Sequence, residues 1–496
     1  MKSLLIPKEV KKIVEKLGKA GFEAYVVGGC VRDFLIGKKP KDWDITTSAT
    51  PKKTQKIFPD SVYENQFGTV GIKTKEKDLT LKIIEVTTFR IEGKYSDKRH
   101  PDDIRFAKSI KEDLSRRDFT INTLALKIKK NKGFEIIDPY KGQNDLNHKI
   151  IRCVGEPDKR FSEDALRLMR AIRFNVELGI INGWKIEDKT WKAVESNSRL
   201  IKVISQERIR DELVKILLSK EATNGMFLLH KSGLLRYIIP ELEEGINVKQ
   251  NKHHIYTVWE HGIRSLDYAA NNEYDLEVRL ASLFHDIAKP KVKAGEGKNC
   301  TFYGHEVLGA KMVSRILSRL KFSKDLIDKV VTLVRYHGFF YEVETTTDAS
   351  IRRLLIKVGK DNIEALAQVR EADRIGSGCP KAVPFKLRHF LFRVEKILKE
   401  QKGHQPSLKM LKVDGEDIMK IAKLEAGPRI GYILNILLEQ ILDDPNRNTK
   451  EILTHDILEL SKLSDKELKN KNVQAKEKYN KLLSEYTDKI KKKYYV

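Results

Sequence analysis

The stretch GGCVRDFLIGKKPKDWDITT, residues 28–47, decides the fold. It follows a short apolar run, Ala24–Val27, which is typical of a β-strand, and we expect a helix to start at about Val31. The pair Gly28–Gly29 therefore lies between a strand and a helix, where the backbone can approach a phosphate without a Cβ in the way. The helix N-terminus supplies N–H donors, and Arg32 adds a bidentate phosphate donor. Because Gly-Gly turns are common, this signal is weak on its own.

Two carboxylates follow, Asp42 and Asp44, on either side of Trp43. On a strand, residues i and i+2 point to the same face, so both carboxylates can hold one cation. Their repulsion raises a pKa unless a cation such as Mg²⁺ neutralises it. The alternative is a surface turn, since the preceding K-P-K-D is turn-like. Glu85, on a second strand predicted over residues 82–89, is a candidate third carboxylate or a solvated side chain.

Together these parts suit a metal-assisted transfer of a nucleotide. A hydroxyl would attack the α-phosphorus of a nucleoside triphosphate, and pyrophosphate would leave. Mg²⁺ is the expected ion, because carboxylate oxygens are its usual protein ligands.

The same string resembles the signature of the class II tRNA nucleotidyltransferase and bacterial poly(A) polymerase family. Further motifs of that family follow in its order over about the first 215 residues: EVTTFR (85–90), DLSRRDFTIN (113–122), IDPYKGQNDL (137–146), SEDALRLMRAIRF (162–174) and ERIRDEL (207–213). The resemblance implies addition of C, C and A to the 3′ end of tRNA from CTP and ATP, without a template. It also implies a role for each matching residue: Gly28, Gly29 and Arg32 at the triphosphate, Asp42 and Asp44 at the catalytic Mg²⁺, Arg117 with Arg116 at the nucleotide and ribose, and Asp164, Arg167, Arg170 and Arg173 on a nucleotide-selecting helix.

The spacing of the residues also predicts the nucleotide-selecting helix. Asp164, Arg167 and Arg170 lie three residues apart, so they share one face of a helix that begins at about Ser162. An Asp accepts and an Arg donates, which matches the NH₂ group and ring nitrogen of cytosine and adenine. Uracil and guanine present a carbonyl where the carboxylate needs a donor, and a buried mismatch of that kind is costly. The alternative is a surface salt bridge between residues i and i+3.

A second group of residues has metal-ligand chemistry. Imidazole and carboxylate side chains are the usual mixed ligands of Mn, Ni, Fe or Mg. The group resembles the HD phosphohydrolase superfamily, whose minimal pattern is H…HD…D, and the resemblance implies a second divalent metal and a hydrolytic activity on RNA phosphates. The alternative is a degenerate module kept for its helical shape or for binding RNA. Its members are His261, His285, Asp286, His305, His337 and Asp373.

Composition favours a nucleic-acid partner. The 496 residues carry 95 Lys+Arg against 70 Asp+Glu, a net charge of +25, which suits a polyanion, although a Lys-rich genome gives the same excess. The four cysteines lie far apart, which indicates a reducing compartment. The N-terminal stretch lacks the apolar core of a signal peptide, and no apolar run of about 18 residues occurs. We therefore expect a cytoplasmic protein without a membrane span. The oligomeric state is not predicted.

The expected architecture is α+β, with a small nucleotidyltransferase head followed by helical domains. The predicted segments are a head over 1–147, a helical neck and body over 148–250, an HD domain over 251–385 and a helical tail over 386–496. Within the tail, residues 411–448 resemble the tail of HD-bearing tRNA nucleotidyltransferases, which implies tRNA binding. The last 36 residues are lysine-rich, and they suit a solvated helix or an RNA contact.

Several related activities share these motifs. The loop over residues 88–106, with Tyr95, Asp97 and Arg99, argues against addition of CC alone, because family members restricted to CC addition typically lack it. An A-adding enzyme and a poly(A) polymerase remain alternatives, since an Asp–Arg pair accepts both C and A. From a different class come an HD hydrolase with a vestigial head and an inactive RNA-binding protein. The intact Asp42 and Asp44 argue against both.

Overall fold

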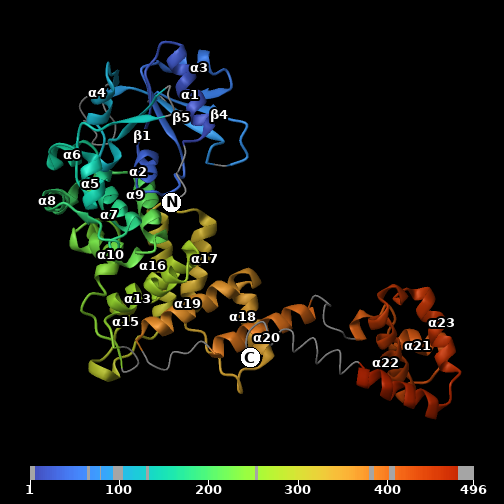
Figure 1. The fold of residues 1–496 in the computed structure, drawn as a ribbon. Coiled ribbons are helices and arrows are strands. Elements are labelled where there is room, and N and C mark those ends of the chain that lie inside the picture. The colour runs from blue at the N-terminus through green and yellow to red at the C-terminus, as the bar shows by residue number, and fades with distance from the viewer. Residues whose placement is uncertain are drawn as a thin grey trace. The chain divides into compact units, whose positions relative to one another are not determined.

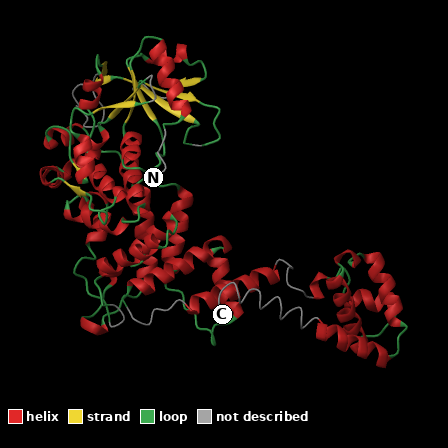
Figure 2. Ribbon diagram, viewed as in Figure 1, coloured by secondary structure: helices red, strands yellow, loops and turns green. Residues whose placement is uncertain are grey.

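The computed structural model describes residues 6–63, 68–78, 80–92, 104–129, 133–251, 255–378, 385–401 and 408–478. The chain divides into two compact units, one of residues 1–337 with 368–379 and the other of residues 338–367 with 380–496. The expected α+β class is confirmed: the strands gather near the N-terminus and helices follow (Figures 1 and 2). Tyr95, Asp97 and Arg99 lie outside the described residues.

A seven-stranded sheet forms the head, in the order β3-β4-β5-β2-β1-β8-β9. β2 pairs antiparallel with β1 and parallel with β5, and the register sets Asp44 beside Glu85. The sheet strands are β1 (Ala24–Val27), β2 (Asp44–Thr47), β3 (Ser61–Tyr63), β4 (Thr69–Lys73), β5 (Ile83–Thr88), β8 (Ala125–Ile128) and β9 (Phe134–Ile137). Two short pairs lie outside it: β6 (Arg90–Glu92) with β7 (Ile104–Phe106), and β10 (Ile150–Ile151) with β11 (Lys185–Ile186).

The helices of the head are α1 (Lys8–Lys19), α2 (Gly29–Leu35), α3 (Pro51–Ile57), α4 (Ile110–Ser115) and α5 (Gly142–His148). Helix α2 begins at Gly29, two residues earlier than the expected start at Val31. The reason is Gly28, whose φ of 83° turns the chain sharply enough for the next residue to enter the helix.

Helices make up the rest of the first unit. They are α6 (Pro157–Glu163), α7 (Leu166–Leu178), α8 (Asp188–Ser196), α9 (Gln206–Leu218), α10 (Ala222–Lys231), α11 (Leu235–Ile238), α12 (Pro240–Glu243), α13 (Val258–Asn271), α14 (Leu276–Phe284), α15 (Lys289–Val292), α16 (His305–Arg319) and α17 (Lys324–Tyr336). Helix α19 (Ile363–Gly376) runs from the second unit into the first. The 3-10 turns of the chain are Thr120–Asn122, Ser198–Val203, Gly297–Asn299, Lys360–Asn362, Leu408–Met410 and Pro445–Arg447.

The prediction of one helix from Ser162 was wrong. Ser162 lies inside α6, and the chain leaves the helical conformation at Asp164, where φ is −138° and ψ is 104°. The Asp164 carboxylate then accepts the Leu166 N–H at 3.1 Å, at the start of α7. Aspartate favours helix N-termini over helix interiors because its short side chain bonds free N–H groups of that kind.

The second unit contains α18 (Asp348–Val358), α20 (Phe385–Gln401), α21 (Gly415–Ala422), α22 (Pro428–Asp443) and α23 (Lys450–Ser461), followed by a helical stretch over 465–478. This stretch is not simply solvated, as the lysine content suggested. Leu468 belongs to a core with Ile433, Leu437 and Ile457. Lys478 pairs with Glu439 at 2.6 Å. Residues 479–496 lie outside the description.

None of the helices within the described ranges combines the length and the apolar composition needed to cross a bilayer.

Candidate active site and metal centre

A cavity of about 1440 Å³ lies in the first unit. Thirteen arginine or lysine side chains and seven aspartate or glutamate side chains line it, so its charge suits a triphosphate or RNA. The walls contain every sequence-predicted residue of the nucleotide site except Glu85: Gly28, Gly29, Arg32, Asp42, Asp44, Arg117, Asp164, Arg167, Arg170 and Arg173. The structure therefore brings the separate motifs of the sequence to one place.

The predicted carboxylates Asp42, Asp44 and Glu85 lie near the N-terminal end of β2. Asp44 is its first residue and lies level with Glu85 on the parallel strand β5. Asp42 lies in a bend before the strand, not on it as expected, but the alternation holds because the intervening Trp43 is buried. Burial, then Asp42 and Glu85, raise the pKa of Asp44 to about 7, against a smaller opposing effect of Arg117. A group of oxygen ligands with this excess of negative charge fits a hard divalent cation.

Gly28 keeps the space beside these carboxylates open. Its φ is 83°, and a Cβ built there would lie 3.2 Å from Nη1 of Arg117 and 3.4 Å from Oδ2 of Asp44. Any side chain would thus fill the gap between the carboxylate and the guanidinium. The approach of this backbone to a phosphate stays a prediction.

Cys30 lies directly behind this gap. Its buried thiol contacts the Val27 carbonyl oxygen at 3.1 Å. Burial, then the charge of Asp44, raise the pKa of this thiol far above its usual range.

Asp113 arranges the two neighbouring arginines, and the sequence analysis gave it no role. Its fully buried carboxylate accepts from Arg116 at 2.9 Å and from Arg117 at 3.4 Å. It also accepts the backbone N–H of Arg90 at 3.3 Å. Burial alone would raise the pKa of Asp113, but Arg116 and Arg117 outweigh it and lower the pKa. The Asp113 carboxylate therefore fixes where both guanidinium groups enter the cavity.

Arg32 reaches from the head to the neck. Its Nη1 donates to Asn122 at 2.9 Å and its Nε to Asp33 at 2.9 Å. The guanidinium also lies over the ring of Phe174 on α7, 5.2 Å from the centroid. The residue predicted to bind phosphate thus lines the cavity while it joins α2 to α7.

The arginines of α7 are held by acidic partners. Asp118 accepts from Arg170 at 2.8 Å, and Arg170 outweighs burial and lowers the pKa of Asp118 far below its usual range. Arg173 lies 3.1 Å from the buried Glu212 carboxylate of α9. Asp118 and Glu212 both stand within motifs that the sequence displays, but their partners lie 52 and 39 residues away. Arg170 and Arg173 therefore hold the neck together as well as facing the cavity.

Asp164 and Arg167 do not share a helix face, because Asp164 precedes α7. The Asp164 carboxylate receives both Nη atoms of Arg208, at 3.2 and 2.8 Å. Arg167 donates to Glu163 at 3.0 Å and to the Arg116 carbonyl at 2.9 Å. The expected i, i+3 arrangement was wrong, although both side chains line the cavity.

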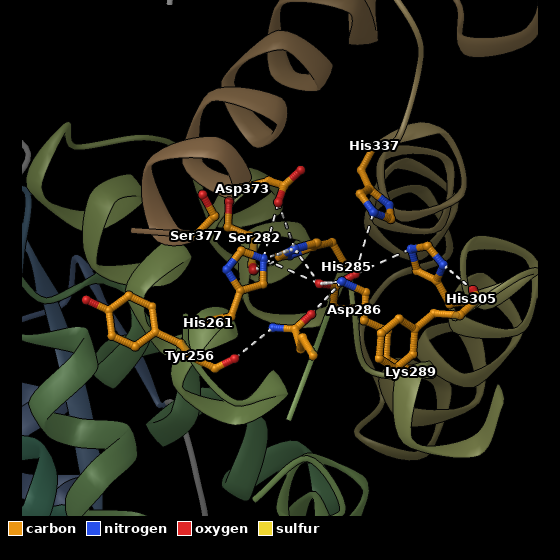
Figure 3. A network of polar contacts seen from close by, with 12 residues as sticks. Tyr256, His261, Ser282, His285, Asp286, Lys289, His305, His337, Asp373 and Ser377 are labelled. Carbon is orange, nitrogen blue, oxygen red and sulfur yellow. Dashed lines mark hydrogen bonds and ion pairs between the residues drawn. The ribbon is translucent and has the colours of Figure 1, made fainter. Parts of the chain in front are cut away.

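A second cluster, of histidine and aspartate side chains, lies in the first unit (Figure 3), and none of these side chains lines the cavity. Nε2 of His261, on α13, lies 2.8 Å from Nε2 of His285, which follows α14. Asp373, on α19, approaches these two nitrogens to 3.2 and 3.5 Å. Asp286 lies 3.3 Å from each of them and faces His305 at 3.4 Å.

The donor atoms of this second cluster fall into two groups that share Asp286. One is His261, His285 and Asp286, and the other is Asp286, His305 and His337. Burial lowers the pKa of His285, but Asp286 and Asp373 outweigh it and raise that pKa to about 10. Burial and His285 lower the pKa of His337 to about 3. The buried carboxylates thus require positive charge among the imidazoles, and these mixed N and O donors fit divalent metal ions.

Lys289 is a further member that the sequence analysis missed. Its buried ammonium lies 2.6 Å from Asp286 and 2.6 Å from the side-chain oxygen of Gln250. Lys289 stands three residues after Asp286, so one turn brings the two side chains together. That spacing was the available signal.

Comparisons with known proteins identify the family of the chain. The model described as "Poly A polymerase head domain" matches residues 24–152, "Probable RNA and SrmB- binding site of polymerase A" matches 183–246, and "tRNA nucleotidyltransferase domain 2 putative" matches 306–457. The CCA-adding enzyme of Ligilactobacillus salivarius is 34% identical over 459 residues, which cover 90% of this chain and 96% of that protein. That of Lactococcus lactis subsp. lactis is 31% identical and covers 90% and 97%.

Solved structures show the same architecture. The Bacillus stearothermophilus CCA-adding enzyme in complex with CTP matches with a TM-score of 0.57 and 27% identity, over 92% of this chain and 98% of that one. The Thermotoga maritima CCA-adding enzyme complexed with tRNA matches in fold, with a TM-score of 0.50 and 21% identity over 92% and 96% of the two chains.

The fold and the carboxylate site thus define a nucleotidyltransferase that acts on tRNA. Its sequence matches relatives over nearly their full length, and the chain belongs to the family of CCA-adding enzymes.

The Asp44→Asn variant should lose activity and gain stability. We expect nucleotide incorporation to fall by about 10³-fold or more if Asp44 holds the catalytic cation as predicted. A carboxyl group whose pKa rises from 3.8 to about 7 on folding destabilises the metal-free fold at pH values above that range. At pH 8 with EDTA, chemical denaturation should therefore show the variant about 2 kcal/mol more stable. A variant that is both inactive and less stable would indicate a structural role for Asp44.

Gly28→Ala should weaken nucleotide binding. The added methyl group enters the gap between Asp44 and Arg117, so we expect KM for CTP and ATP to rise by about tenfold. Gly21 is the control, because its φ of 85° is also positive and its Cβ would meet nothing within 4 Å. If Gly21→Ala raises KM equally in steady-state assays, backbone strain explains the effect and the open gap does not.

Proposed function

We propose that the chain completes tRNA 3′ ends with C, C and A in a metal-assisted reaction at Asp42, Asp44 and Glu85. The observation that carries the proposal is the register of β2 and β5, which sets Asp44 beside Glu85, with Asp42 two residues away. When bound to these carboxylates, a divalent ion, expected to be Mg²⁺, lowers the pKa of the attacking 3′ hydroxyl and offsets charge on the triphosphate.

Other side chains of the cavity would bind the phosphates and stabilise their charge. Arg117, fixed by Asp113 beside Gly28, is placed to stabilise negative charge on the reacting phosphate. Arg32 and the N–H groups at the start of α2 would hold the outer phosphates. We assign both roles from the lining of the cavity and from the chemistry of the groups.

Asp164 and Arg167 would choose the base. A carboxylate has about four lone-pair sites, so Asp164 can accept an exocyclic NH₂ of cytosine or adenine while Arg208 holds it. A base with a carbonyl at that place would leave the carboxylate facing an acceptor. Because the protein itself supplies this choice, no template is needed.

The decisive test uses tRNA transcripts ending before CCA, after CC, and complete. Each is incubated with Mg²⁺ and single labelled nucleotides and sized on a gel. We expect CCA to be completed and extension to stop there, with UTP and GTP rejected. Addition of a single A to the CC-ending transcript alone would indicate an A-adding enzyme, and a long A ladder a poly(A) polymerase. Absence of incorporation would overturn the proposal.

A second activity is supported by the buried cluster around Asp286. We propose that His261, His285, Asp286 and Asp373 hold one divalent ion, and that Asp286, His305 and His337 contribute to a second. A metal ion held by these residues would lower the pKa of a water molecule and so supply the nucleophile for hydrolysis of a phosphoester. Lys289 would keep Asp286 ionised through its contact at 2.6 Å. The substrate we propose is a terminal or 2′,3′-cyclic phosphate on RNA.

Asp286→Asn should separate the two activities. The variant loses the charge shared by both metal groups, so we expect bound metal and phosphohydrolase activity to be lost while CCA addition is retained. Elemental analysis measures the bound metal, and assays with 2′,3′-cyclic nucleotides measure the phosphohydrolase activity. tRNA extension measures CCA addition. His455→Ala is the control, because that side chain is 76% exposed and lies in the second unit. Loss of both activities would instead indicate a structural role for the cluster.

Two coarser proposals complete this assignment. Residues 411–448 of the second unit would bind tRNA by shape and backbone charge, with α22 as the core of that region. The described cysteines Cys30, Cys153 and Cys300 are free and buried, which supports work in the reducing cytoplasm.

A further inference from the structure

Two large aliphatic side chains on the cavity wall are exposed. They lie near the C-terminal ends of α7 and α9, whereas Asp164 precedes the start of α7. Ile181 is 83% exposed and Leu218 is 48% exposed, and both line the cavity. Ile181 follows α7, and Leu218 ends α9, which packs against α7 (Figure 1). Single exposed aliphatic residues are ordinary, but two that line the same cavity as Asp42 and Asp44 call for a physical reason.

Hydrogen bonds to two side chains hold the loop that carries Ile181. The buried Glu221 carboxylate accepts the backbone N–H groups of Ile180 and Ile181, each at 3.0 Å. Lys149 donates to the carbonyl of Asn182 at 2.6 Å. A buried carboxylate is destabilising unless it is hydrogen-bonded, so Glu221 needs these two N–H donors. The same hydrogen bonds hold the backbone of the loop in place.

Leu218 is fixed in the same way by a buried cation. Nη1 of Arg279 donates to the carbonyl of Leu217 at 2.8 Å and to that of Ser219 at 3.0 Å. The carbonyls on both sides of Leu218 are therefore held by one guanidinium. Glu221 and Arg279 thus hold the backbone on which Ile181 and Leu218 stand. Both apolar side chains remain exposed and available to contact a ligand in the cavity.

Basic side chains surround this pair. Lys215 and Lys220 line the same stretch of wall, with side chains 49% and 84% exposed. Lys220 also contacts Glu273 at 3.0 Å, a pair on the surface where ion pairs contribute little. Exposed ammonium groups beside apolar side chains match a single-stranded nucleic acid, whose phosphates meet the cations and whose bases meet the apolar surface.

We propose that Ile181 and Leu218 form a seat for the unpaired nucleotides at the 3′ end of the tRNA primer. The inference rests on the proposed function, since that supplies the primer. The length of the wall fits the occupant: α7 has 13 residues, and at 1.5 Å per residue it spans about 20 Å, the reach of a few nucleotides. The seat would hold the primer behind its reacting hydroxyl, which lies at the carboxylate end of the same cavity.

The test compares Ile181→Asp and Leu218→Asp with Ile356→Asp. Ile356 is a matched control, because it is also 83% exposed but lies on α18 of the second unit. We expect KM for tRNA to rise about tenfold in the first two variants, which corresponds to about 1.4 kcal/mol, with KM for CTP unchanged. The rise should persist on a minihelix of the acceptor arm, since the seat contacts only the RNA end.

A second readout does not depend on incorporation. A photoreactive amino acid at position 181 should cross-link to the unpaired 3′ nucleotides of tRNA, and the same group at position 356 should not. An unchanged KM for tRNA in both variants, or cross-links confined to paired stems, would overturn the seat while leaving the proposed function intact. A parallel rise in KM for CTP would also overturn it, because Ile181 would then act on the nucleotide site.

Discussion

Buried carboxylates govern how the first unit is assembled, because each must be matched by positive charge when it leaves water. Asp113 is matched by two arginines, Asp118 by Arg170, and Glu212 by Arg173. The Asp118–Arg170 pair joins the head to α7, and the Glu212–Arg173 pair joins α9 to α7. Asp44 differs from them, since its neighbours raise its pKa instead of lowering it. Positive charge within the fold therefore compensates Asp44 less fully than the other three carboxylates, which supports the proposed cation site there.

The two sites of the unit solve this requirement differently. At the head, the carboxylates lie at a cavity edge and share one arginine, so the compensating charge can arrive together with the nucleotide. At the second cluster, imidazoles and a buried lysine surround Asp286, and the positive charge is part of the fold. The two sites of one unit therefore differ in how much compensating charge the fold itself supplies.

Local sequence predicted what depends on short distances. The glycine turn, the alternation of Asp42 and Asp44 around Trp43, and the order of the histidines all follow from spacing along the chain. Glu85 could not be placed with confidence from sequence, because its position beside Asp44 depends on a parallel pairing across 41 residues. Arg208 was missed because its pairing with Asp164 spans 44 residues and leaves no periodic pattern. Lys289 was missed although its spacing of three residues from Asp286 is a local signal. The break at Asp164 was also missed, since a strong helical periodicity on both sides concealed a residue that prefers a helix start.

Cys30 gives the head a chemical selectivity that the carboxylates alone would not provide. A thiolate so close to Asp44 would be a soft ligand and would attract zinc or copper to a site that needs a hard cation. Burial and the adjacent negative charge keep this thiol protonated at neutral pH, and its contact with the Val27 carbonyl turns it into the protein. Because oxidants react with thiolates, the buried and protonated thiol of Cys30 is a poor target for them although it lies next to the candidate active site.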